Sequence, residues 1–252
     1  RNVLGWLKIY SLPIVTVLLG LGLTAGAFYF LTQQNRNERQ EEFRELASRR
    51  FKNLDLKIAD IENNLHSTVD FVESIDQLTR KKFRTFTSGV LRRNPFVLAV
   101  QWLPRVPSQR RDHFEKILRE SGFQGFEIKE HAEDGTLRSA GTREVYFPVR
   151  YVEPLDVPGN KQTLGFDQGS ITGRLKTMLQ ASRNNRASGT LSTFFFRARD
   201  LDNENRYHSE DQAILLFEAA QRQESPGSVE GVDGYVSLAI PDEEFLSNTL
   251  LP

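Results

Sequence analysis

The sequence predicts an α+β fold with a mostly antiparallel sheet, preceded by an N-terminal transmembrane helix and a long helix. Three observations predict this order. An uncharged apolar stretch comes first, a stretch without Pro or Gly follows from residue 35 to about residue 82, and short apolar runs then alternate with helical patterns. We therefore expect a membrane anchor over residues 1–34, a long helix over 35–90 and a globular domain over 91–252, in a chain that is a fragment of a longer protein.

Composition limits the classes of protein to which the chain can belong. The 252 residues include 33 Lys and Arg and 33 Asp and Glu, so the formal net charge is zero. A neutral chain offers no electrostatic support for a nucleic-acid partner. Cys is absent, which excludes disulfides, thiolate metal sites and a Cys nucleophile but does not assign a compartment.

The N-terminal stretch has the length and composition of a membrane-spanning helix. No charged residue occurs from Ile9 to Gln34, and about 20 apolar residues at ~1.5 Å per residue cross a ~30 Å hydrocarbon layer. The run is longer than the apolar region of a cleaved signal peptide, so we expect a retained anchor. More Lys and Arg residues follow the span than precede it, and this count alone places the following domain in the cytoplasm.

Two patterns favour a dimer. Gly22 and Gly26 form a G-x-x-x-G within the span, which lets two membrane helices approach closely, although glycine is also common in such helices. The long helix carries a 4-3-4-3 seam with one polar exception, at Ala47, Phe51, Leu54, Ile58, Ile61, Leu65, Thr68, Val72 and Ile75. The seam either packs against its own domain or forms a two-stranded coiled coil. The candidate dimer contacts are Gly22, Gly26, Leu54, Ile58, Ile61 and Leu65.

The globular domain is predicted to alternate strands with helices. Ser108 is placed to cap a helix, Gly122 to end it, and Pro148 to lie at an edge or bulge of its strand. The predicted strands cover residues 96–102, 126–130, 145–152, 190–197, 214–217 and 235–240, and the predicted helices cover 108–119 and 170–184. These elements predict a mostly antiparallel sheet.

Two separated blocks of this domain resemble the CHASE domain family. The first is Asn94-Pro95-Phe96 leading to Val100-Gln101-Trp102-Leu103-Pro104-Arg105-Val106, followed by Arg110-Arg111-Asp112-His113-Phe114-Glu115. The second is Tyr146-Phe147-Pro148-Val149-Arg150-Tyr151-Val152-Glu153-Pro154 with Gly165-Phe166-Asp167. The blocks occur in the order and spacing of the family, and the resemblance covers residues 52 to 252.

The resemblance implies a sensory module of a receptor histidine kinase or a cyclic-di-nucleotide enzyme. It implies a long helix followed by two PAS-like α/β subdomains, here a distal part over 91–200 and a truncated proximal part over 201–252. It also implies a homodimer and a small-molecule ligand in the distal part. We therefore expect an inner (plasma) membrane protein whose residues after about 34 lie in the periplasm or extracellular space, against the count of positive charges.

The resemblance also implies candidate ligand-binding residues. Asp167 aligns with a family aspartate that binds a planar ligand through its carboxylate, and Leu191 lies near a leucine that offers backbone groups. Strand alternation then places Phe147, Val149, Tyr151 and Thr193 along an apolar wall. The alternatives are that Asp167 caps a helix and that the aromatic residues are ordinary core. The chain departs from cytokinin-binding members over residues 200–205 and 215–220, so the identity of the ligand does not transfer.

No arrangement of residues predicts catalysis. The four histidines, His66, His113, His131 and His208, lack the spacing of metal ligands, and the sequence has no P-loop or nucleophile elbow. We predict no catalytic residue, metal or cofactor in this segment. The remaining alternative to a small-molecule sensor is a membrane-tethered scaffold that binds a protein partner through the long helix.

Overall fold

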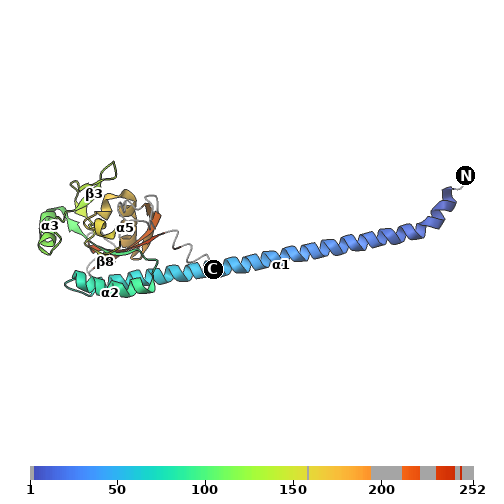
Figure 1. The fold of residues 1–252 in the computed structure, drawn as a ribbon, viewed down its shortest axis with the longest axis horizontal. Helices are drawn as coiled ribbons and strands as arrows, with labels where there is room; N and C mark the ends of the chain where they lie inside the picture. The colour runs from blue at the N-terminus through green and yellow to red at the C-terminus, as the bar shows by residue number, and fades with distance from the viewer. Residues whose placement is uncertain (1–2, 158, 194–211, 222–230, 242–244, 246–252) are drawn as a thin grey trace. The chain divides into compact units, whose positions relative to one another are not determined.

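The computed structural model describes residues 3–157, 159–193, 212–221, 231–241 and 245 (Figure 1). The chain divides into two compact units, residues 1–55 and residues 56–252. The division falls inside the first helix, α1, which runs over Val3–Glu73. The residues from 56 onward therefore carry the end of α1 together with the globular domain.

The membrane anchor predicted over residues 1–34 is not confirmed. Among the residues whose side chains the structure describes, no helix has an apolar stretch long enough to cross a membrane. The prediction lies partly outside these residues, because the side chains of residues 1–14 and 31–34 are not among them.

The prediction of one helix reaching residue 90 is wrong. The chain turns at residues 74–79, and a second helix, α2, covers Arg80–Arg93. The side chain of Thr79 starts α2 by accepting a hydrogen bond from the backbone N–H of Lys82, which satisfies one of the free donors of a helix N-terminus. A polar N-cap can therefore begin a new helix after a turn that contains neither Gly nor Pro.

Helix α2 lies antiparallel beside the end of α1. Phe71 of α1 stacks on Phe86 of α2, with ring centroids 4.2 Å apart. Farther along the pair, Arg93 donates a hydrogen bond to the side chain of Asn64 at 3.2 Å. The last turns of α1 are therefore held by their own chain.

The apolar seam of α1 is buried in its C-terminal part and more exposed before that. Ile61 and Leu65 are buried, at 2% and 0% exposure. Their burial agrees with the first of the two alternatives, in which the seam packs against its own domain. A dimer seam therefore does not include these two residues in this structure. Ile58 is 40% exposed and Leu54 is half-buried, and their role as dimer contacts stays a prediction, as does that of Gly22 and Gly26.

The globular domain is built on one five-stranded sheet with the order β6-β1-β9-β8-β7. Every neighbouring pair in it is antiparallel, so the α+β class with antiparallel sheets is confirmed. Its strands are β1 Ala99–Pro104, β6 Tyr151–Glu153, β7 Ser188–Thr193, β8 Gln212–Gln221 and β9 Val232–Pro241. Two short ribbons pair β2 Val106–Pro107 with β5 Val145–Tyr146 and β3 Lys129–His131 with β4 Leu137–Ser139.

The boundary predicted near residue 200 does not separate two sheets. Strands β8 and β9 follow it, yet β9 pairs with β1 and β8 pairs with β7. The tandem arrangement of two PAS-like subdomains is therefore not confirmed. Residues 194–211 and 246–252, which the prediction divided between the two parts, lie outside the described residues.

Two local predictions near the helices have opposite outcomes. The predicted helix 108–119 is a short 3-10 helix, η1 Ser108–Arg110, followed by α3 Arg111–Glu120. The N-cap residues are Pro107 for η1 and Arg110 for α3, so Ser108 caps neither helix and its predicted role is wrong. Gly122 follows α3 with φ 99°, a conformation that glycine adopts without a steric penalty, and its predicted role is confirmed.

The predicted strand 145–152 is interrupted. Strand β5 ends at Tyr146 and β6 begins at Tyr151, and Pro148 between them has no N–H to donate to a sheet. The chain here forms a single bridge with Asp167 instead. Downstream lie the short helix α4 Asn160–Thr163, the 3-10 helix η2 Gln168–Ser170 and α5 Thr172–Asn184, which ends at Asn185 in the left-handed conformation.

The two faces of the sheet carry different elements. Helix α5 covers one face, where Met178 and Ala181 pack with Ala99 and Leu103 of β1. On the other face the hydroxyl of Tyr151 donates a hydrogen bond to the carbonyl of Leu78 in the α1–α2 turn at 3.1 Å. The end of α1, the turn and α2 therefore lie against the face opposite to α5.

A polar contact joins α1 to the middle of this second face. Nδ1 of His66 lies 2.7 Å from Oε1 of Glu218 on β8, and the Glu218 side chain is 8% exposed. The hydrogen bond with Glu218 raises the pKa of His66 above its ordinary value, and burial raises the pKa of Glu218. Both groups therefore hold protons more tightly in the folded protein than in the unfolded chain.

This contact predicts that the folded protein loses stability as the pH rises. Raised pKa values mean that the native state binds more protons, so the free energy of unfolding falls with pH. The His66 contribution is complete below its unfolded pKa of about 6.5 and is lost as the pH rises through the raised folded value. Urea unfolding at pH 6 and pH 8 measures the difference, which should shrink in His66→Gln. The exposed His113→Gln is the control, and an equal pH dependence in both variants would contradict the assignment.

Candidate functional site

The structure gives Asp167 a structural role that accounts for both of its oxygens. Asp167 is 0% exposed, and its Oδ1 accepts hydrogen bonds from the backbone N–H groups of Phe147 at 2.8 Å and Gly169 at 3.1 Å. Its Oδ2 accepts one from Arg143 at 2.8 Å. The carboxylate thus caps η2, which resembles the capping alternative left open by the sequence.

Asp167 belongs to a wider ionic network. Arg143 also pairs with Glu130, which is 6% exposed and accepts two further hydrogen bonds from Arg138. Burial raises the pKa of Asp167, while the Phe147 N–H, the Arg143 guanidinium and the Gly169 N–H lower it. The network fastens the β3–β4 ribbon to the segment that leads into α5.

The predicted apolar wall is only partly assembled. Phe147 and Val149 are buried in the core beneath α5. Tyr151 faces the opposite side, where it packs on Phe83 of α2, because the break between β5 and β6 ends the alternation along this segment. Leu191 on β7 is 63% exposed, and the side chain of Thr193 lies outside the described residues.

The core beneath α5 contains buried polar groups. Gln168 connects Gln101 of β1 to Arg174 of α5 through hydrogen bonds of 3.1 and 2.5 Å. The hydroxyls of Tyr235 and Ser237 on β9 are buried without a hydrogen-bond partner among the described residues. Burial raises the pKa of Tyr235 to about 12, so this hydroxyl stays protonated at physiological pH and remains a donor.

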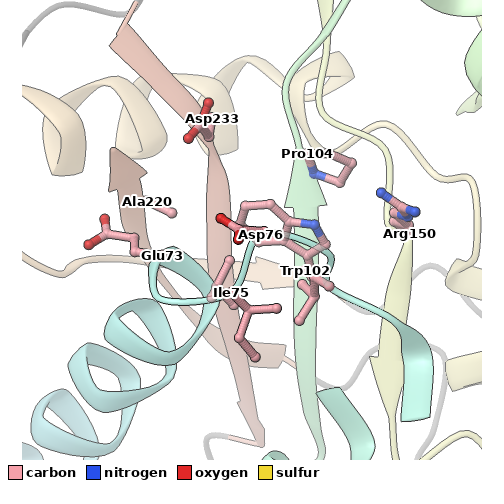
Figure 2. A pocket seen from close by; sticks show the side chains of 10 residues that line it. Glu73, Ile75, Asp76, Trp102, Pro104, Arg150, Ala220 and Asp233 are labelled. Atoms are coloured by element: carbon pink, nitrogen blue, oxygen red, sulfur yellow. The ribbon is translucent and has the colours of Figure 1, made fainter. Parts of the chain in front are cut away.

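A cavity of about 250 Å³ opens on the other face of the sheet, where α1 ends (Figure 2). Its lining comes from six places in the chain: the last turn of α1, the α1–α2 turn, β1, the segment before β6, the end of β8 and the start of β9. The lining residues are Val72, Glu73, Ile75, Asp76, Leu78, Trp102, Pro104, Arg150, Ala220 and Asp233. A molecule bound in this cavity contacts α1 and the sheet together.

Local structure fixes the walls of this cavity. The backbone N–H of Arg150 donates to the carbonyl of Trp102 at 2.9 Å, which holds the two side chains next to each other. Glu73 accepts a hydrogen bond from the backbone N–H of Gln221 at 2.6 Å, which ties the end of α1 to the end of β8. Figure 2 shows the Trp102 indole between Arg150 on one side and Glu73 on the other.

A second cavity, of about 530 Å³, lies among the loops around β3. Phe123, Phe126 and Leu164 contribute apolar surface, and Lys129 and Lys161 contribute positive charge. No residue of α1 lines it. Among the described residues, no group of three or more His, Asp and Glu side chains is placed to hold a metal ion.

The residues of the cavity at the end of α1 were not predicted as a site. Trp102 and Arg150 lie inside the two blocks that carry the family resemblance, so a signal for them was present in the sequence. Asp76 and Asp233 lie 157 residues apart in the sequence numbering, and no local pattern connects them. Their proximity depends on the turn after α1 and on the pairing of β9 with β1.

Comparison with known families agrees with this fold. A family model of the CHASE domain matches residues 76–248, which is more than half of the chain and includes most of the α1–α2 turn and all five strands of the sheet. No curated protein matches the chain. The chain belongs to the CHASE domain family. CHASE domains are extracytoplasmic, non-catalytic sensory domains of signalling receptors.

Proposed function

We propose that this CHASE domain binds a small molecule outside the cytoplasmic membrane and transmits a conformational signal across that membrane. The effector is a histidine kinase or a diguanylate cyclase or phosphodiesterase in the full protein. Membership of a family of sensory domains supports the general role. The cavity at the end of α1 is the observation that carries the proposal, because a ligand there contacts both the sheet and the helix that leads away from it.

The route of the signal is part of the proposal. Helix α1 continues without a break from Glu73 back to Val3, so a change at its end has a stiff element along which to travel. Large apolar side chains on α1 are 61% to 75% exposed at Val17, Leu19, Leu23 and Phe28. Such exposure fits contact with an apolar environment outside the chain, and we propose that this environment is the membrane.

Homodimerisation is also a proposal. Phe51 and Ile58 of the predicted seam are 64% and 40% exposed, so this stretch offers apolar surface to a second copy. The dimer would then place two α1 helices side by side, as the heptad spacing predicts. The same surface is what a scaffold would use for a protein partner, and the ligand experiment below separates the two functions.

A cavity-filling variant tests the sensory function. Native mass spectrometry and thermal-shift screening against a metabolite extract compare the wild type with Ile75→Trp and Ile117→Trp. Ile75 lines the cavity from the turn, so the larger ring occupies it, whereas Ile117 is 41% exposed on α3 and is not among the lining residues. We expect a compound that raises the Tm of the wild type and of Ile117→Trp by several degrees but leaves Ile75→Trp unchanged.

Two other outcomes contradict the proposal in different ways. A compound that stabilises all three proteins equally binds elsewhere, and the cavity is then not the sensory site. Absence of any stabilising compound would remove the small-molecule function and leave the scaffold as the better explanation.

A further inference from the structure

Two opposite charges in the wall of the cavity at the end of α1 have no ion-pair partner among the described residues. Arg150 and Asp76 both line the cavity, and neither forms an ion pair within the part of the chain that the structure describes. Neither residue pairs with the other. A cavity that holds both signs of charge unpaired is suited to a ligand that carries both.

The positive side of the cavity is oriented by its neighbours. The Arg150 guanidinium lies over the Tyr151 ring, 5.0 Å from the ring centroid. Its Nε is buried and has no hydrogen-bond partner in the part of the chain that the structure describes. Arg150 itself lines the cavity, and a ligand carboxylate there meets its guanidinium in the planar geometry that this group prefers.

The negative side lies at the end of α1. The last turn of α1 has no basic residue, although the C-terminus of a helix carries partial negative charge that favours a cation. Glu73 and Asp76 add two carboxylates there, and Asp233 adds a third from β9. The Trp102 indole lies between Glu73 and Arg150 (Figure 2), and its face attracts an ammonium group.

We infer that this cavity binds a small zwitterion of the α-amino acid class, with its carboxylate on Arg150 and its ammonium group toward Asp76 and Glu73. The inference rests on the proposed sensory function and adds the chemical class of its ligand. The volume of about 250 Å³ lies below the ~300–1,000 Å³ of sites for drug-sized ligands. It therefore fits a small amino acid.

Tryptophan fluorescence tests this inference. The chain has two Trp residues, so Trp6→Phe leaves Trp102 as the single reporter at the cavity wall. The full chain carrying this change is titrated with glycine, L-alanine, L-serine and L-proline. Propionate and ethylamine serve as matched compounds that each lack one charge of alanine. We expect saturable changes with one or more of the amino acids and at least tenfold weaker binding of both single-charge compounds.

Charge-removing variants locate the contacts. Arg150→Gln and Asp76→Asn should each weaken amino-acid binding by about 10- to 100-fold, as expected for a charged hydrogen bond worth ~1.5–3 kcal/mol. Arg110→Gln and Asp112→Asn, two exposed positions at the start of α3, are the matched controls and should bind as the wild type does.

The possible outcomes distinguish a failure of the zwitterion inference from a failure of the proposed sensory function. If a metabolite from the extract screen binds in the cavity but no amino acid does, the proposed sensory function is supported and the inference of a zwitterionic ligand is overturned. Equal binding of alanine, propionate and ethylamine would also overturn it. If Arg150→Gln and Asp76→Asn bind alanine as tightly as the controls, the amino acid binds outside this cavity and the inference fails.

Discussion

Replacing Asp167 with alanine is expected to lower the free energy of unfolding by about 2–4 kcal/mol, because it leaves buried donors without acceptors. The carboxylate is fully buried and accepts from Phe147, Gly169 and Arg143. Some of the loss is offset, since the cost of burying the charge disappears with it. Urea denaturation of the full chain measures the change.

Two further variants make this prediction specific. Asp167→Asn keeps one oxygen for the backbone N–H groups but removes the charge that Arg143 pairs with, so its loss should be smaller. Asp156→Ala changes an exposed aspartate and should stay within about 0.5 kcal/mol of the wild type. An Asp167→Ala protein as stable as the wild type, with ligand binding lost, would instead restore the role in ligand binding that the family resemblance implied.

Gly165→Ala is expected to destabilise the fold by about 3 kcal/mol or more. Gly165 has φ 83°, and a Cβ there would overlap the backbone carbonyl oxygen of Glu127. The left-handed conformation costs an L-residue about 1–3 kcal/mol, and relief of the overlap must move the backbone that leads into β3. The segment before Asp167 then loses its place against the ribbon.

A second glycine provides the control for that change. Gly173 lies in the first turn of α5, where an added Cβ meets nothing within 4 Å. Alanine has the higher helix propensity, so Gly173→Ala should leave the Tm unchanged or raise it slightly. Thermal unfolding measures the Tm of both variants, and an equal change in Tm would contradict the role given to Gly165.

The sequence predicted the fold class because its signals are local. The apolar run at residues 235–240 lies within β9, and the helix predicted at 170–184 is α5 to within two residues at its start. The break between α1 and α2 was missed because residues 74–79 contain neither Gly nor Pro. The decisive feature there is the single cap at Thr79, a signal that was present in the sequence.

The site was harder to predict because it depends on contacts between distant segments. The cavity joins the α1–α2 turn to Trp102, Arg150 and Asp233, and only the sheet order places them together. Asp167 was singled out for its resemblance to a ligand-binding aspartate. Whether such a residue meets a ligand or a backbone N–H depends on the path of the chain around Pro148, which alternation along a continuous strand does not describe.

Hydrogen exchange with and without the ligand from the screen tests whether that ligand binds in the cavity at the end of α1, because slowed exchange locates where a molecule binds. We expect slower exchange of backbone N–H groups over residues 72–80 and 99–104, which form the cavity wall and the turn after α1. Slower exchange confined to α5 and to the segment around Phe147, with no change at the end of α1, would contradict it and place the sensory site on the opposite face of the sheet.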